Sequence, residues 1–211
     1  MTLAKNRGFE FYIYSWNIYT YGATGEYGID NNPQNPKTIA YMRKCTTQLF
    51  ETYPDLTGFG VTAGENLFPL SNHEEADWTW ATYGKGVLHF AKANPERNVT
   101  LIHRYHGAGA EEVASNFQSL IDIPNVTFDF SFKYTVTHIY STTTPEWVLT
   151  RSGNVPQQLI DLNLKTWIER RNDSFYCLHW GDSDFVKEHL HGIPEKEKTF
   201  REFFMGSDGI T

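Results

Sequence analysis

The sequence alternates between short apolar segments typical of β-strands and amphipathic segments typical of helices. This alternation constrains the fold more than any other feature, because strands joined through helices pair in parallel. Strands, with their polar ends, are expected at residues 9–17, 57–66, 98–104, 126–133, 164–169 and 199–205. A helix is expected to open at Asn35-Pro36 and to carry its apolar stripe over residues 38–52. Further helices are expected at residues 77–93, from the glycines at 107 and 109 as far as 120, 156–161 and 182–191. The predicted fold class is therefore α/β with a parallel sheet.

Two architectures fit this alternation, an open doubly wound sheet and a closed (β/α)8 TIM-type barrel. No Gly-x-Gly-x-x-Gly opens a helix in this chain, and nearly every expected strand ends in polar residues, which is where a barrel places its chemistry. We therefore predict the barrel. A closed barrel has eight strands and typically about 250 residues, whereas we count about six strands in 211 residues. The prediction is one incomplete barrel domain over residues 1–211, missing roughly two strands, mostly on the N-terminal side.

The stretch at 57–66, Thr-Gly-Phe-Gly-Val-Thr-Ala-Gly-Glu-Asn, is an apolar strand bracketed by glycines that ends in a carboxylate beside an amide. A carboxylate at the end of a buried strand is costly unless it is partnered, so Glu65 is a candidate for chemistry. Glu169 ends the strand at 164–169 in the same way. Two such carboxyl groups suit hydrolysis of a glycosidic bond, in which one protonates the leaving oxygen and the other acts as base or nucleophile. For each glutamate, a salt bridge at the rim with a neighbouring arginine is the alternative.

The remaining polar residues at strand ends are candidate substrate contacts. Arg104 and Lys133 either balance the charge of the two glutamates or bind an anionic group of the substrate. Asp208 lies in a Gly-Ser-Asp-Gly sequence, which is as typical of a turn as of a site. The full set of candidate contacts is Trp16, Asn17, Asn66, His103, Arg104, His106, Lys133, Arg171 and Asp208.

Three histidines, His103, His106 and His138, raise metal binding as an alternative. The His-x-x-His sequence at 103–106 falls on a strand or loop and lacks the helical spacing of a zinc motif. No acidic cluster completes an obvious site around it. We therefore predict neither a metal nor any other cofactor.

The overall charge bounds the class of partner. A formal net charge of -7 without a run of lysine or arginine argues against nucleic acid and against an anionic membrane surface. The aromatic content of 16% slightly favours a carbohydrate partner, because flat rings stack on sugars. No apolar run approaches membrane-spanning length and no secretory signal opens the chain. Localisation and oligomeric state are left unassigned.

The order of these features resembles the xylan α-glucuronidases, a family built on a (β/α)8 barrel. That family has a strand with a Ser-Ile-Asn-Tyr-like end, then a Pro-Asp-Phe-Gly-Gly-Phe strand leading to its acid, and later strands ending in Trp-Arg, Val-Lys-Asn and a Met-Met-Glu-like triplet. The counterparts in this chain are residues 14–19 (Tyr-Ser-Trp-Asn-Ile-Tyr), residues 53–59 (Tyr-Pro-Asp-Leu-Thr-Gly-Phe) with Glu65, His103-Arg104, Phe132-Lys133-Tyr134 and Trp167-Ile168-Glu169. The similarity runs from Gly8 to about Glu169 and is one of layout with scattered identities.

The resemblance implies a general acid at Glu65, one candidate base at Glu169 and substrate contacts at Arg104 and Lys133. Two positions depart from the family. The position of the family's other proposed base falls near His138, and a lysine that helps to bind the uronate is replaced by Thr62. The resemblance therefore points to a related but distinct group of glycosidases.

We predict a glycoside hydrolase that acts on a plant or microbial polysaccharide or oligosaccharide, with an α-glucuronidase-like specificity as the form that the resemblance implies. Whether the chain is active by itself stays open. Two other classes remain as alternatives. One is a non-catalytic barrel that binds carbohydrate through its aromatic residues, and the other is a metal-dependent barrel enzyme such as a sugar isomerase or deacetylase.

Overall fold

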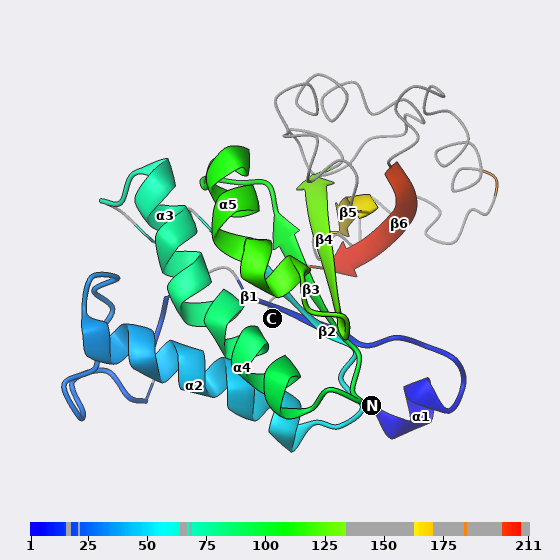
Figure 1. Cartoon of the computed structure of the whole chain (residues 1–211), viewed down its shortest axis with the longest axis horizontal. Helices are drawn as coiled ribbons and strands as arrows, with labels where there is room; N and C mark the ends of the chain where they lie inside the picture. The colour runs from blue at the N-terminus through cyan, green and yellow to red at the C-terminus, as the bar shows by residue number, and fades with distance from the viewer. Residues whose placement is uncertain are drawn as a thin grey trace. The chain divides into compact units, whose positions relative to one another are not determined.

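A computed structural model describes residues 1–15, 18–20, 22–63, 67, 69–133, 163–170, 184 and 200–207 (Figure 1). The chain divides into two compact units, Met1–Phe128 and Asp129–Thr211. The prediction of one catalytic domain over 1–211 is not tested by this division and stays a prediction.

The first unit is a layered α/β structure. Its strands β1, β2 and β3 pair side by side and in parallel. In Figure 1 the longer helices of this unit cover one face of these strands. The elements are α1 (Thr2–Lys5), β1 (Tyr12–Ser15), α2 (Pro36–Thr52), β2 (Gly58–Thr62), α3 (Asn72–Thr79), the π-helical turn η1 (Trp80–Gly84), α4 (Lys85–Ala93), β3 (Val99–Arg104), α5 (Ala110–Ile121) and the start of β4 (Val126–Lys133).

The helices begin where the sequence supplies caps for their unpaired backbone N–H groups. The Asn35 side chain accepts a hydrogen bond from the Lys37 amide, and Pro36 occupies the first turn of α2. Ser71 and Glu74 form a reciprocal capping box that starts α3. The helix predicted at 77–93 therefore begins five residues earlier than expected. It also contains the π-helical turn at Trp80–Gly84, which the apolar spacing did not reveal.

Aromatic rings join the helices to one face of the strands. Phe59 of β2 lies 5.4 Å from Tyr83 of η1, measured between ring centroids, and His103 of β3 lies 5.3 Å from Phe117 of α5. Because side chains alternate across a strand, the residues one position before and after Phe59 belong to the opposite face. There Gly58 and Gly60 lie beside the rings of Tyr12 and Tyr14.

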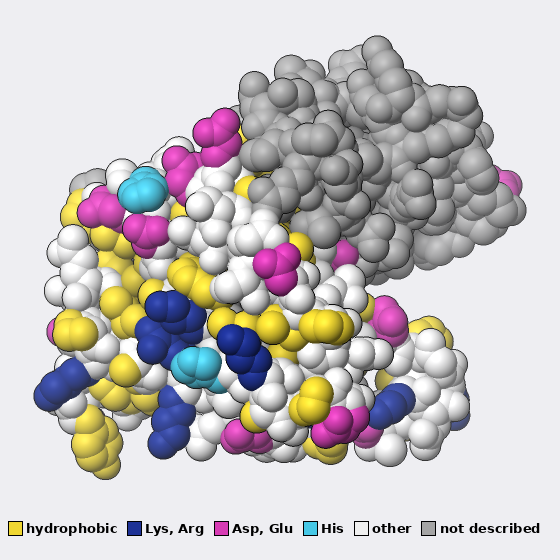
Figure 2. Space-filling view, in the orientation of Figure 1, with side chains coloured by type: hydrophobic (Ala, Val, Ile, Leu, Met, Phe, Trp, Pro, Cys, Tyr) yellow, Lys and Arg dark blue, Asp and Glu magenta, His cyan; other side chains and the backbone are white. Residues whose placement is uncertain are grey.

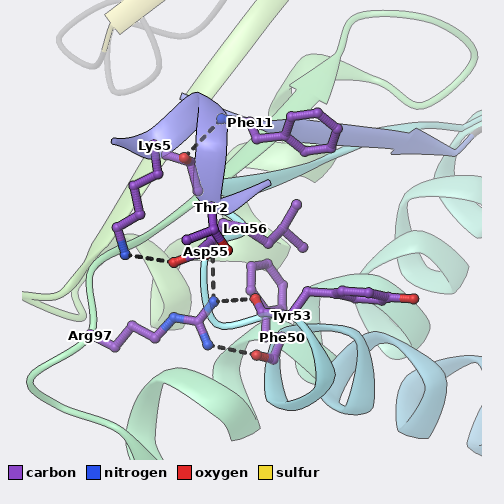
Figure 3. Close-up of polar contacts among 9 residues, drawn as sticks. Thr2, Lys5, Phe11, Phe50, Tyr53, Asp55, Leu56 and Arg97 are labelled. Carbon is purple, nitrogen blue, oxygen red and sulfur yellow. Dashed lines mark hydrogen bonds and ion pairs between the residues drawn. The ribbon is translucent and has the colours of Figure 1, made fainter. Parts of the chain in front are cut away.

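Arg97 fastens the end of α2 to the beginning of β2 (Figure 3). Its guanidinium donates hydrogen bonds to the backbone carbonyls of Phe50 at 2.6 Å, Tyr53 at 2.9 Å and Leu56 at 3.1 Å. The same group lies over the Phe90 ring, 4.9 Å from its centroid. These carbonyls belong to the C-terminal end of a helix and the turn after it, where acceptors lack intrahelical partners. Arg97 is therefore a structural cation.

Asp55 holds α1 at this same end of the strands. Its carboxylate accepts a hydrogen bond from the Thr2 hydroxyl and lies 3.1 Å from the Lys5 ammonium (Figure 3). These two contacts lower the pKa of Asp55, the Thr2 hydrogen bond contributing most. The helix at Thr2–Lys5 was not expected, and the strand predicted at 9–17 is shortened to Tyr12–Ser15 among the described residues.

The second unit contains the rest of β4, with β5 (Asn163–Arg170) and β6 (Phe200–Ser207). β4 pairs with β5 and β5 with β6, both in parallel, with an irregularity between Leu164 and Lys165. The expected parallel α/β class is thus confirmed, and six strands occur in the described ranges. Closure into a barrel is not shown and stays a prediction. The helices expected at 156–161 and 182–191 fall outside the described residues, except for the single helical position Asp184.

The helix-covered face of the first unit carries both signs of charge. Figure 2 shows acidic and histidine side chains over the start of α3, and lysine and arginine side chains over α2 and α4. Within the described ranges, none of the helices combines the length and hydropathy needed to cross a membrane.

Candidate functional site

The carboxyl ends of β2 and β3 meet at Thr62 and Arg104, which are register partners. Both residues are buried. By the alternation of the strands they share the face of Gly58 and Gly60, opposite the face that packs on the helices. Arg104 is the last residue of β3, so it lies at the carboxyl end of the parallel strands, where α/β proteins bind their ligands. Its contact with substrate stays a prediction.

Two tyrosine rings of β1 line the same face below Arg104. A Cβ atom at Gly58 would lie 2.8 Å from the Tyr12 ring, and a Cβ at Gly60 would overlap the ring of Tyr14. Only glycine therefore leaves room for the two rings against β2. Tyr14 remains 40% exposed, so part of its ring is open to contact. The sequence analysis missed this surface, although the facing patterns Tyr-x-Tyr and Gly-x-Gly were a usable signal.

His103 does not belong to that face. Its side chain is fully buried on the helix-covered side, where the ring meets Phe117 edge-on. Burial lowers the pKa of His103 to about 4, so the imidazole is neutral at physiological pH. The interpretation of His103 and Arg104 as adjacent substrate contacts overlooked strand alternation. We correct it by assigning His103 to the core.

His106 links the segment after β3 to the end of β2. Its Nδ1 atom lies 3.1 Å from the backbone carbonyl oxygen of Ala63. In the neutral tautomer with a proton on Nδ1, Nδ1 donates to this carbonyl and Nε2 is the acceptor nitrogen. Ala63 comes two residues before Glu65 in the sequence. His106 is therefore positioned to hold the strand end from which Glu65 follows.

Glu75 is a buried carboxyl group that the sequence analysis did not single out. It is 6% exposed in the first turns of α3, and its Oε2 atom has no hydrogen-bond partner among the described residues. Burial raises the pKa of Glu75. Trp78, one turn later, has an indole N–H without a partner in the same described ranges, and its ring packs edge-on against Tyr83.

Two further predicted site residues, Lys133 and Glu169, lie at the carboxyl ends of β4 and β5. Lys133 is the last residue of β4 and Glu169 the next to last of β5. Lys133 is the register partner of Trp167, two positions before Glu169. Outside the described residues lie Trp16, Asn17, Glu65, Asn66, His138, Arg171 and Asp208.

Metal binding is the alternative that the three histidines raise. In those ranges, no three histidine, cysteine, aspartate or glutamate residues lie close enough together to bind a metal ion. His103, one of the three histidines considered for a metal, is enclosed by the core.

Comparison with known proteins identifies a structural relative. No protein-family model matches the chain, and no curated protein matches it. Among solved structures, the chain is similar to one described as a GH138 enzyme targeting pectin rhamnogalacturonan II, with a TM-score of 0.66 and 17% sequence identity. The match covers 97% of this chain and 29% of that enzyme. The chain thus shares a fold with part of a glycoside hydrolase and spans less than a third of its length.

Proposed function

We propose that this chain contributes the catalytic strand ends of a glycoside hydrolase that acts on a pectic polysaccharide. The observation that carries the proposal is the placement of Arg104 at the carboxyl end of β3, beside Thr62 and on the same face as the exposed Tyr14 ring. Polar groups above an apolar, aromatic floor are typical of a site that orients a small or extended ligand. The shared fold with a pectin-targeting enzyme supports this choice of ligand.

In the proposed reaction, Glu65 is the general acid and Glu169 the base. The protonated carboxyl of Glu65 donates its proton to the glycosidic oxygen as the bond from that oxygen to the anomeric carbon breaks. Glu169 removes a proton from a water molecule, whose oxygen forms the new bond to the anomeric carbon. A separation of about 6.5–9.5 Å between the carboxyl groups would indicate inversion, and about 5–5.5 Å would indicate retention with Glu169 as nucleophile.

Arg104 and Lys133 are proposed to bind the substrate in this scheme. A guanidinium is suited to a carboxylate because it can donate two parallel hydrogen bonds. An acidic sugar is therefore the preferred occupant of the proposed site, in line with the α-glucuronidase-like interpretation. Thr62 supplies no charge at the position where the α-glucuronidases have a lysine, so that specificity rests on Arg104 and Lys133.

The test is Glu65→Gln assayed on rhamnogalacturonan II, with released sugars separated by chromatography. The amide cannot act as the acid, so kcat is expected to fall by about 10²–10⁴-fold while binding of the polysaccharide is retained. Glu51→Gln, an exposed change in the last turn of α2, is the matched control and should leave kcat unchanged. Unchanged turnover in Glu65→Gln would rule out the acid role.

The same assay separates catalysis from binding alone. The exposed Tyr14 ring would also suit a barrel that only binds carbohydrate. In that case the unsubstituted protein would bind rhamnogalacturonan II without releasing any sugar, and Glu65→Gln would change neither property.

A further inference from the structure

Tyr27 combines a strained backbone with a side chain that is almost fully exposed. Its φ angle is 54°, in the left-handed region, and no other described residue except glycine has a positive φ. A bulky residue in this region is strained, whereas glycine or asparagine accepts it readily. The Tyr27 side chain is 84% exposed, more than that of any other large hydrophobic residue described. Burial of the ring therefore contributes no stabilisation that could offset the backbone strain.

The loop around Tyr27 is ordered by hydrogen bonds on both sides of the tip. The Gly25 amide donates to the Ile29 carbonyl at 2.7 Å, and the Ile29 amide donates to the Glu26 carbonyl at 2.8 Å. Gly25 and Gly28 also have positive φ angles, which allows the tight turn. The hydrogen bonds that close this turn therefore hold the Tyr27 backbone in its left-handed conformation.

The tip is also tied to the beginning of α2. The Asn35 side-chain amide donates to the Gly28 carbonyl at 2.9 Å and to the Asp30 carboxylate at 3.0 Å, while its oxygen caps the helix through the Lys37 amide. The buried Thr38 hydroxyl donates to the Asp30 carbonyl at 2.8 Å. These bonds to α2 restrict the backbone of the loop, while the Tyr27 ring stays exposed to solvent.

We propose that Tyr27 binds a sugar residue of the polysaccharide by stacking, at a point separate from the bond that is cleaved. Strain without a return in folding marks a residue held for function. The loop follows the carboxyl end of β1, and this is the end of a parallel sheet at which α/β proteins bind their ligands. Its exposed neighbours are Glu26, Asp30, Asn31 and Asn32. A single ring among polar groups suits the C–H face and hydroxyls of a sugar, whereas a protein partner needs a contiguous apolar patch. The choice of ligand rests on the proposed function.

Gel electrophoresis through immobilised polysaccharide tests the stacking role. Rhamnogalacturonan II, homogalacturonan and xylan are the three probes. Tyr27→Asn removes the ring but keeps a residue that tolerates the left-handed backbone, and we expect affinity for the retained polysaccharide to drop about three- to tenfold. Tyr27→Phe should bind as the unsubstituted protein does. Tyr53→Asn removes another exposed ring at the other end of α2 and serves as the control.

Thermal unfolding gives a second, independent measurement. Because the ring leaves the core untouched and asparagine relieves the backbone strain, Tyr27→Asn should unfold at the same temperature or a higher one. A fall of several degrees would show that the ring supports the fold and would overturn the inference. Binding of Tyr27→Asn equal to that of the unsubstituted protein, or failure of the latter to bind any of the three polysaccharides, would overturn it as well.

The outcomes for Tyr27 and for Glu65 can be told apart. Weaker binding in Tyr27→Asn by a protein that releases no sugar would support the stacking role and contradict the hydrolase. Sugar release by the unsubstituted protein, with binding unaffected in Tyr27→Asn, would support the hydrolase and contradict the stacking role.

Discussion

At the scale of single residues, position along a strand decides role more than chemical type does. His103 and Arg104 are adjacent in the sequence and were predicted to serve together. The structure assigns them to opposite faces, His103 against Phe117 and Arg104 beside Thr62. The sequence shows that side chains alternate along a strand, but it does not show which alternate set of residues packs against the helices. That information came from the contacts of Phe59 and His103 with residues of η1 and α5.

The buried imidazole of His103 predicts a loss of stability in acid. Its pKa is about 4 in the folded protein and about 6.5 in an unfolded chain. The unfolded state therefore binds the proton more readily between these values. The free energy of unfolding should be fully retained above pH 6.5 and should fall by about 3 kcal/mol as the pH drops through 4.

Urea unfolding at a series of pH values measures this loss. His103→Leu should have a flatter profile than the unsubstituted protein over that window, whereas His89→Gln, a change at an exposed histidine, should not. Identical profiles for His103→Leu and the unsubstituted protein would contradict the assignment of His103 to a neutral core position.

At the scale of elements, β1 and β2 are matched by size. The two glycines of β2 accommodate the two tyrosine rings of β1, and a methyl group at Gly60 would overlap Tyr14. Gly60→Ala should lower the free energy of unfolding by about 1–3 kcal/mol because the ring must move. In a Tyr14→Ala background the same change should be nearly neutral, giving a coupling of about 1–3 kcal/mol in a double-mutant cycle. An equal cost in both backgrounds would show that the ring is not what excludes the methyl group.

The helix and strand boundaries show what local sequence can and cannot supply. The strand at 126–133 was predicted with its observed bounds, and α2 begins at the expected proline. The helix at Thr2–Lys5 was missed because it depends on Asp55, fifty residues away in the sequence. The π-helical turn was missed because its pattern does not differ from that of a helix with apolar spacing.

At the scale of the molecule, the parallel α/β class was predictable from alternation, whereas barrel closure stays a prediction. The candidate site was predictable only as a set of strand ends. Arg104 keeps its proposed role, Tyr14 was added by the structure, and Glu65 and Glu169 remain to be tested by substitution. What the sequence lacked was the long-range packing that decides which face of each strand is available.

The first unit should depend on the Arg97 contacts for its stability. Arg97→Lys keeps the charge but cannot reach three carbonyls and the rings of Phe50 and Phe90 in one geometry. We expect the free energy of unfolding to fall by about 2–4 kcal/mol, measured by urea denaturation. Arg7→Lys, an exposed arginine in the N-terminal segment, should change it by less than about 0.5 kcal/mol. Equal effects of the two substitutions would contradict the structural role of Arg97.

The space that Gly58 and Gly60 leave for Tyr12 and Tyr14 also fixes the register in which β1 pairs with β2. If β1 slid two residues toward the end of β2, Tyr14 would meet Thr62 in place of Gly60, and the ring would lose its space. A slide in the other direction would bring Tyr12 against Leu56. Steric clashes of the tyrosine rings therefore disfavour pairing of β1 and β2 in either shifted register. The two tyrosine rings therefore determine the position along β2 at which β1 ends and the following loop begins.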